Sequence, residues 1–464
     1  MKPSIRVNRT TGTMLLTITG LVILREWTPI ALPNLILPWL VIATTLLLAL
    51  QTSAGRYLFA LVALALTITL ALANPDWQAV TLNALYTAGF ICAFFTALAT
   101  LRFAAETSES IRRAGRFLAQ QPPGRRYLAL TLGGQMFALL LNYGSIALLG
   151  SLATASANEE PDPEIRRHRT RRMLLAIQRA FTSMLPWSPL SFAVAISVAL
   201  IPGATWAQAV LPGIVSSILL AGTGWALDSM FRPTLSGPRP VARPPEGSWA
   251  SILPLLVLLA ILVSSITLLH YVTDVRVVGM VILIVPVIAL VWTALQSRNA
   301  EPELRIPRRL TEYSFSELPA YRSEILLLMM AGYIGTVGAP LLEPLLSGLG
   351  LDLAALPTPL VLIAFVWIIP LAGQIAMNPI LAVTLIAPLV PPAAELGVSP
   401  TALIVAITAG WALSGVTSPF TATTLLIGSF ARISARHVGL RWNGVYFLLT
   451  GAILSAWVVI HASL

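Results

Sequence analysis

Long apolar segments alternate with short polar ones along the whole chain. An apolar run of about 20 residues is long enough to cross the hydrocarbon core of a bilayer as one helix. These runs predict about eleven spans, at residues 11–25, 32–50, 56–74, 78–101, 173–200, 205–228, 249–272, 277–296, 323–346, 401–431 and 442–462. The pattern therefore predicts an all-α polytopic membrane protein.

Two further apolar stretches, 127–156 and 357–395, do not fit as single spans. The first has basic segments on both sides, and short basic loops stay on the cytoplasmic side of a membrane. The second has no Lys or Arg in either flank, which fits the outer side. We therefore predict two re-entrant hairpins that enter from opposite faces, with tips at Asn142 and Asn378-Pro379. The alternative for 127–156 is one long helix, which would break the positive-inside rule.

The span that follows each hairpin contains a break near mid-membrane. Ser188-Pro189 interrupts the predicted helix 173–200, and Ser418-Pro419 interrupts the predicted helix 401–431. Ser418 lies 230 positions after Ser188, so the two breaks can be aligned with one another. Irregular backbone at membrane depth is tolerated only where protein or a watery cavity satisfies it.

These matches divide the chain into two halves of opposite orientation. We predict a first inverted repeat at 1–228, a cytoplasmic linker at 229–248 and a second inverted repeat at 249–464. A Gly-Gln pair, at 134–135 and at 373–374, also precedes each hairpin tip. The placement of basic residues predicts a cytoplasmic N-terminus and an outer C-terminus.

Composition supports a membrane protein and limits the other classes. The chain is 56% hydrophobic and 10% charged, with a mean hydropathy of +0.82, whereas a soluble protein carries about 25% charged residues. The net charge of +10 comes from basic residues in the short connectors, which indicates topology and anionic lipid rather than nucleic acid. Only Arg25 and Arg276 lie away from the predicted cytoplasmic face. One cysteine, Cys92, excludes an intramolecular disulfide framework.

Broken helices in mid-membrane expose N–H groups on one half-helix and C=O groups on the other. The N–H end favours an anion and the C=O end favours a cation. Proline and glycine that merely kink packed helices are the simpler interpretation. Paired breaks in matched positions favour a substrate chamber instead, with binding residues Asn142, Gly144, Ser145, Ser188, Pro189, Ser191, Asn378, Pro379, Thr417, Ser418, Pro419 and Thr421.

Ionisable residues add little to this predicted site. Arg179, about two turns into 173–200, could bind an anionic substrate, but we favour a side chain that reaches the cytoplasmic interface. No His, Cys and carboxylate cluster, nucleophile–base pair or Walker motif stands out in the sequence. An enzyme, a metal centre and ATP-driven transport are therefore not expected, and the only cofactor that we consider is Na⁺ as a coupling ion.

The second hairpin and broken helix resemble those of the ion transporter superfamily, which includes divalent-anion/sodium symporters, arsenite efflux permeases and membrane subunits of tripartite carboxylate transporters. Thr417-Ser418-Pro419 matches the Thr-x-Pro motif of that group, and Asn378 matches its hairpin asparagine. The symporters carry Ser-Asn-Thr at both tips, whereas this chain has Leu141-Asn142-Tyr143 and Met377-Asn378-Pro379. The resemblance implies a homodimer with a scaffold domain and a mobile transport domain that moves like an elevator.

We therefore expect a secondary active transporter of the plasma membrane for a small anionic solute, coupled to Na⁺ or H⁺. Candidate Na⁺ ligands are Asn142, Ser188, Asn378 and Ser418. One alternative is an efflux permease for a metalloid oxyanion or a drug. An alternative of another class is a receptor or assembly subunit that uses a transporter-like scaffold without transport.

Overall fold

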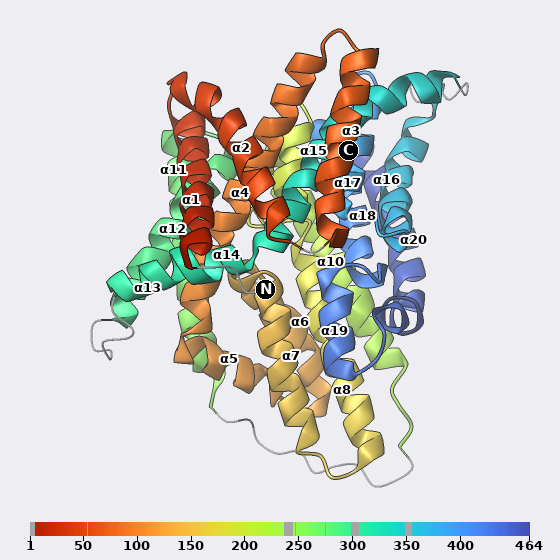
Figure 1. Ribbon diagram of the computed structural model, residues 1–464. Coiled ribbons are helices and arrows are strands. Elements are labelled where there is room, and N and C mark those ends of the chain that lie inside the picture. Colours follow the sequence, from red (N-terminus) through yellow and green to blue (C-terminus); the bar gives the residue numbers. More distant parts are fainter. Residues whose placement is uncertain are drawn as a thin grey trace. The chain divides into compact units, whose positions relative to one another are not determined.

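The computed structural model describes residues 5–52, 54–235, 245, 247–273, 275–297, 306–348 and 355–464. Within these ranges, all regular elements are helices (Figure 1). The predicted all-α class is therefore confirmed. Most of the predicted linker 229–248 lies outside the described residues.

Nine helical segments of the described chain are long and apolar enough to cross a membrane. They correspond to nine of the predicted spans and comprise α1 (Ile5–Trp27), α2 (Leu32–Leu50), α4 (Trp77–Glu106), α10 (Trp206–Met230), α11 (Leu253–Val272, preceded by the 3₁₀ turn η1, Trp249–Ile252), α12 (Val277–Gln296), α15 (Arg322–Gly348), the broken pair α18 (Pro400–Thr417) and α19 (Ala422–Ala431), and α20 (Gly444–Ala462). The other two predicted spans are α3 (Ala54–Ala73) and the broken pair α8 (Pro163–Met184) and α9 (Phe192–Leu200). Short helices fill the polar segment before α15: α13 (Ile306–Glu312), η3 (Tyr313–Glu317) and α14 (Leu318–Ala320).

The chain forms two compact units, and each takes segments from both halves of the sequence. Unit 1 consists of Met1–Ala104, Leu262–Ala355 and Ile380–Pro391. Unit 2 consists of Ala105–Ile261, Leu356–Pro379 and Pro392–Leu464. The compact units therefore do not coincide with the sequence halves 1–228 and 249–464, whose relation as inverted repeats stays a prediction.

In unit 1, both basic residues that lie away from the predicted cytoplasmic face have partners. Arg276 precedes α12 and forms an ion pair with Glu26 of α1, with an Nη2 to Oε1 distance of 2.5 Å. The guanidinium of Arg25 lies over the ring of Tyr86 in α4, 3.8 Å from its centroid. Each of these two arginines therefore has a partner for its positive charge, although neither lies at the predicted cytoplasmic face.

The first hairpin of unit 2 is confirmed. Helices α6 (Pro123–Leu141) and α7 (Tyr143–Asn158) are joined by the single residue Asn142, whose φ of 49° and ψ of −131° end the first helix. Its side-chain Oδ1 accepts a hydrogen bond from the backbone N–H of Tyr143 at 2.8 Å, which caps α7. The alternative of one long helix through 127–156 is therefore wrong.

The second predicted hairpin, 357–395, has its reversal slightly earlier than expected. Helix α16 (Thr358–Gln374) ends before a non-helical stretch at 375–378 in which Ala376 has a φ of 66°. Pro379, predicted at the tip, is instead the first residue of α17 (Pro379–Ile386), a position that suits proline because its missing N–H would have had no helical partner. A 3₁₀ turn, η5 (Ala387–Leu389), follows.

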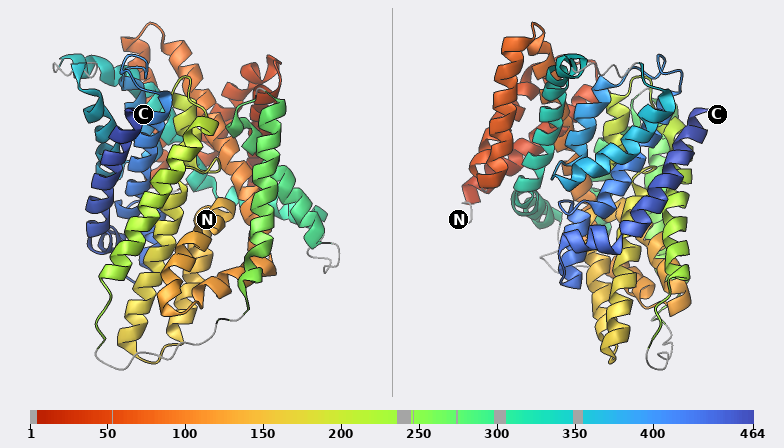
Figure 2. Two further views of the ribbon diagram at one scale, coloured as in Figure 1. Left: turned by 180° about the vertical axis from the view of Figure 1, so that it is seen from behind. Right: turned by 90° about the vertical axis from the view of Figure 1, so that its right-hand side faces the viewer.

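The two arms of the second hairpin fall in different compact units. Helix α16 belongs to unit 2, whereas Ile380–Pro391 belongs to unit 1. In unit 1, a side chain on Gly335 of α15 would overlap the Oγ1 of Thr384 in α17, so α15 and α17 pack closely. Within unit 2, α6 and α7 lie at one end and α16 at the other (Figures 1 and 2).

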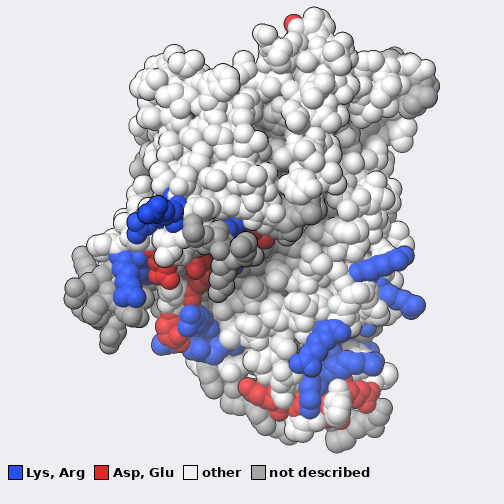
Figure 3. Space-filling view, viewed as in Figure 1, with Lys and Arg blue, Asp and Glu red and all other residues white. Residues whose placement is uncertain are grey.

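Helix α5 (Glu109–Ala119) is amphipathic, as the sequence of the polar segment indicates. Ile111, Phe117 and Leu118 are buried, and Arg112 and Arg113 are exposed. A hydrogen bond from Arg116 lowers the pKa of the Glu109 carboxyl. On the face in Figure 3, further Arg side chains gather near the lower ends of α7 and α8.

Close glycine packing sets the register between each first hairpin helix and its broken helix. A Cβ on Gly134 of α6 would lie 2.8 Å from the Cβ of Ala180 in α8. A Cβ on Gly410 of α18 would overlap the carbonyl oxygen of Phe365 in α16. Gly410 lies 230 positions after Ala180 and Phe365 lies 231 positions after Gly134, which is close to the shift of 230 that aligns the two breaks. The Gly-Gln pairs at 134–135 and 373–374 are 239 positions apart, so they do not follow this shift.

We expect Gly410→Ala to separate α16 from α18 and to destabilise the protein by about 1–3 kcal/mol, because the added methyl group has no space. Gly222→Ala in α10 is the matched control, since a Cβ there meets nothing within 4 Å. The control should be neutral or gain up to about 1 kcal/mol from helix propensity. Thermal unfolding of the purified protein in detergent measures both. Equal midpoints for the two variants would contradict this account of the packing.

Candidate functional site

The two broken helices touch each other inside unit 2. Gln178 of α8 donates from Nε2 to the backbone oxygens of Gly415 and Val416 in α18, both at 3.4 Å. A Cβ on Gly415 would lie 2.8 Å from the Cγ2 of Thr182, so glycine permits this approach. The end of α18 therefore lies against the last two turns of α8.

The first break is a closed loop in which serine hydroxyls replace helical hydrogen bonds. The Ser188 Oγ accepts from the backbone N–H of Leu190 at 3.1 Å. The Ser191 Oγ accepts from the N–H of Val194 at 3.2 Å, which caps α9, and donates to the backbone oxygen of Leu185 at 2.8 Å. Ser188 and Ser191 are 0% and 1% exposed and Pro189 is buried, and among residues 185–191 only Trp187 is partly exposed.

The second break is held in a similar way but is more open. The Ser418 Oγ donates to the backbone oxygen of Gly373 in α16 at 2.6 Å and accepts from the N–H of Phe420 at 3.3 Å. The Thr417 Oγ1 donates within its own helix to Leu413 at 2.8 Å. Phe420 is 57% exposed, and Pro419 beside it is partly exposed. The second break therefore reaches the surface of unit 2.

The start of α19 differs from the start of α9. Thr421 precedes α19, but its side chain makes no capping hydrogen bond to the backbone N–H groups of the first turn. Its hydroxyl instead shares hydrogen bonds with the hydroxyls of Thr423 and Thr424, at 2.9 and 3.1 Å. The positive end of the α19 dipole is thus left without the serine cap that α9 has.

Side chains also satisfy the carbonyl groups at the end of α18. The oxygen of Gly415 accepts from the Thr423 hydroxyl, and the oxygen of Val416 accepts from the Nδ2 of Asn443 at 3.3 Å. The Ser418 oxygen accepts from the Thr424 hydroxyl at 2.5 Å. A helix end in an apolar setting needs such donors, because an unpaired buried carbonyl is costly. In this conformation these oxygens are bonded to protein rather than left open for a cation.

The tip of the first hairpin packs on the first broken helix. The ring of Tyr143 stacks on Phe181 of α8 with centroids 4.8 Å apart. Gly144 and Ser145 are buried beside it, and the Ser145 hydroxyl donates to the backbone oxygen of Asn142 at 2.6 Å. The tip is therefore anchored next to α8.

All twelve predicted binding residues lie in unit 2. The structure joins the tip at Asn142 to α8, and α16 to the break at Ser418 through the oxygen of Gly373. Asn378 and Pro379 follow the turn after α16, where Asn378 is partly exposed and Pro379 is buried. The Ser and Thr hydroxyls of the predicted set are engaged in local hydrogen bonds, so the structure gives them a structural role, and their role in binding stays a prediction.

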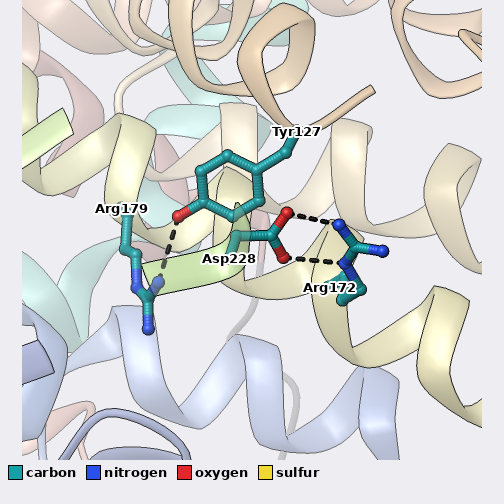
Figure 4. A network of polar contacts seen from close by, with 4 residues as sticks. All are labelled: Tyr127, Arg172, Arg179 and Asp228. Carbon is teal, nitrogen blue, oxygen red and sulfur yellow. Dashed lines mark hydrogen bonds and ion pairs between the residues drawn. The ribbon is translucent and has the colours of Figure 1, made fainter. Parts of the chain in front are cut away.

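The sequence missed a buried polar cluster centred on Arg179 (Figure 4). Arg179 donates from Nε to the Oδ1 of Asn443 at 3.2 Å and from Nη1 to the hydroxyl of Tyr127 at 3.0 Å. Its guanidinium also lies 4.2 Å from the centroid of the Tyr446 ring. Arg179 is only 4% exposed, so the favoured expectation that it reaches the membrane interface is wrong.

No local signal could have revealed this cluster, because its members come from separate helices. Tyr127 follows a run of arginines, and Asn443 lies two residues after Arg441, so both resemble interface residues in sequence. An ion pair lies near the cluster, where Arg172 of α8 donates to both carboxylate oxygens of Asp228 at 2.7 and 2.5 Å (Figure 4). Asp228 is the last residue of the predicted span 205–228 and lies near the end of α10.

Comparison with solved structures identifies the fold. The chain is similar to the YdaH transporter of Alcanivorax borkumensis, described as having an unusual topology, with a TM-score of 0.59 and 16% identity over 88% of this chain and 99% of that one. It is also similar to Neisseria gonorrhoeae MtrF, described with a class of antimetabolite efflux pumps, with a TM-score of 0.53 and 16% identity over 90% of this chain and 97% of that one.

The chain shares the fold of these two proteins. At 16% identity the likeness concerns the fold alone. No family model and no curated protein matches the sequence. Among the residues that the structure describes, no group of three or more His, Cys, Asp or Glu side chains could hold a metal ion.

Two buried serines of the second break region provide a test of its hydrogen bonding. Ser418→Ala removes the donor to Gly373 and the acceptor of the Phe420 N–H, and should destabilise the protein by about 1–3 kcal/mol. Ser414→Ala is the control, because the Ser414 hydroxyl is equally buried and has no hydrogen-bond partner in the described part of the chain. Its removal should be neutral or stabilising. A thermal midpoint that falls as much for Ser414→Ala as for Ser418→Ala would contradict this assignment.

Proposed function

We propose that this protein is a secondary active transporter that moves a small anionic solute across the plasma membrane. The observation that carries this proposal is the contact between two helices that are both broken inside the same compact unit. Breaks of this kind free backbone groups from their helical partners and need other groups to satisfy them. Paired breaks in corresponding positions are a pointer to a transporter's binding site. The transporter fold of the similar structures supports the same conclusion.

The solute would bind where the second break opens at the surface of unit 2. The uncapped N-terminus of α19 offers backbone N–H groups and the positive end of a helix dipole, which suit an anion. Helix α7 of the first hairpin packs against the opposite, C-terminal end of α19, at the contact between Gly150 and Phe430. In this proposal Asn378 and Thr421 contact the solute, and Ser188 and Ser418 hold the broken backbone in shape.

Alternating access would come from movement of unit 2. Both breaks and the whole first hairpin lie within this unit, so it could carry a bound solute as one body. Unit 1 would act as the scaffold and would form a homodimer, as in the elevator mechanism that the superfamily resemblance implies. Na⁺ at Asn142, Ser188, Asn378 and Ser418, or H⁺, would supply the driving force.

A second candidate within transport is efflux of a drug-like compound. The description of MtrF in terms of antimetabolite efflux pumps favours this direction. Efflux and uptake use the same alternating site, so the geometry described above serves both. A receptor or assembly subunit that does not transport is the candidate of another class, and it would gain nothing from two intact breaks.

Transport by the purified protein in proteoliposomes tests the proposal. We expect accumulation of at least one of labelled succinate, benzoate or phosphate when a Na⁺ or pH gradient is imposed, and none without a gradient. Asn378→Ala should reduce the rate at least tenfold while the thermal midpoint stays near that of the wild type. Unchanged flux in this variant would overturn the site assignment.

A cellular assay distinguishes the direction of transport. Cells that express the wild-type chain and cells that express Asn378→Ala are compared for growth inhibition by a panel of antimetabolites. Resistance that depends on Asn378 would support efflux, and increased sensitivity that depends on Asn378 would support uptake. If neither assay shows movement of any solute, the receptor or assembly role replaces the transport proposal.

A further inference from the structure

Arg179 is a charged side chain in the interior of unit 2, and its charge is not balanced by a neighbour. It is 4% exposed, and its protein partners are the neutral groups of Asn443, Tyr127 and Tyr446. No carboxylate in the described part of the chain lies within 4.0 Å of the guanidinium. Arginine stays protonated at any physiological pH, so the positive charge is permanent.

The charged groups around Arg179 do not offset its charge. Arg172 lies two turns earlier on α8 and engages both oxygens of Asp228, the carboxylate near this cluster. Arg171 on the same helix is a further positive charge that interacts with Arg179. The cluster therefore has a surplus of positive charge inside a membrane-embedded unit, and an unpaired buried charge is strongly unfavourable.

The guanidinium also has unused hydrogen-bonding capacity. Its Nε and Nη1 are bonded to Asn443 and Tyr127, while Nη2 has no hydrogen-bond partner among the described residues. The planar fork of arginine suits a carboxylate, because two parallel N–H groups can bind its two oxygens. Glycine at position 224 of α10 makes room for this arrangement, since a Cβ there would lie 2.7 Å from the Tyr127 hydroxyl and 3.2 Å from the Cδ of Arg179.

The cluster is connected to the second break. Asn443, which holds Arg179 through its Oδ1, donates from Nδ2 to the Gln178 Oε1 at 2.9 Å and to the oxygen of Val416 at 3.3 Å. Gln178 in turn binds the last carbonyl groups of α18. Asn443 is thus bonded to both the unbalanced guanidinium and the end of α18, and Gln178 links Asn443 to the same helix end.

From these contacts we propose that Arg179 is the fixed positive charge that binds the anionic group of the transported solute, and that a carboxylate is its preferred partner. This inference rests on the proposed transport function and deepens it by naming the substrate class and the residue that selects it. Asn443 and Tyr127 are positioning residues that orient the guanidinium.

Binding to the full-length protein in detergent, measured by thermal shift, tests the inference. The probes are benzoate, succinate and inorganic phosphate at constant ionic strength, with benzamide as the neutral counterpart of benzoate. We expect at least one carboxylate to raise the wild-type midpoint in a saturable manner, and benzamide to have no such effect. In Arg179→Gln the concentration for a half-maximal shift should rise at least tenfold, measured against that variant's own ligand-free midpoint.

The control is Arg167→Gln, which removes the same charge from an exposed position on the same helix. It should bind the carboxylate like the wild type. The ligand-free midpoint of Arg179→Gln should not fall, because the substitution removes an unbalanced buried charge, whereas a purely structural arginine predicts a fall with unchanged binding. Where Arg179→Gln does not yield folded protein, Arg179→Lys replaces it and should also bind more weakly, since it keeps the charge but loses the fork.

Several outcomes would overturn the inference. They are unchanged carboxylate binding in the Arg179 variants, equal loss of binding in Arg167→Gln, and the absence of saturable stabilisation of the wild type by any of the three anions. Flux assays on the same preparations separate this result from the transport proposal. Wild-type flux that Arg179→Gln retains overturns only the role of Arg179, whereas the absence of flux for every solute overturns the transport function itself.

Discussion

The requirement that every backbone polar group in a bilayer be satisfied governs the structure of unit 2. Continuous helices meet this requirement by themselves, but the helices on either side of Ser188-Pro189 and Ser418-Pro419 cannot. Side chains replace the missing helical hydrogen bonds at both breaks, with Ser191 capping α9 and Ser418 bonding across to Gly373. The first role of the Ser and Thr side chains at the breaks is therefore to satisfy the backbone groups that the breaks expose.

The two breaks of unit 2 differ in how completely side chains satisfy their backbone groups. The first break is buried and capped, whereas the second reaches the surface at Phe420 and leaves the start of α19 without a side-chain cap. Beside the second break lies the charge of Arg179, held by Asn443 but not neutralised. A positive helix end and an unbalanced guanidinium in the same unit form an environment that an anion would stabilise, which is why the charge and the break are best understood together.

The predicted spans agree closely with the observed helices because long apolar runs alone reveal where a membrane helix lies. The helix 277–296 matches its predicted bounds, and the break between α18 and α19 contains the predicted Ser418-Pro419. Charge placement alone predicted the reversal at Asn142, because a single crossing would have violated the positive-inside rule. At the second tip, Asn378 lies in the reversal as predicted, but Pro379 begins α17 instead. The sequence did not decide this, because proline can either end a reversal or begin a helix.

The sequence by itself determined the class, the positions of the helices and the places where they break, because hydrophobicity, proline and charge act over a few neighbouring residues. The tertiary structure decided which residues meet. It placed segments of both halves in each compact unit, paired Ser418 with Gly373, and buried Arg179 between α6 and α20 when its sequence position suggested the interface. The physical reason is that the solvation of a side chain depends on neighbours that can be more than 200 residues away, as Arg179 and Asn443 are.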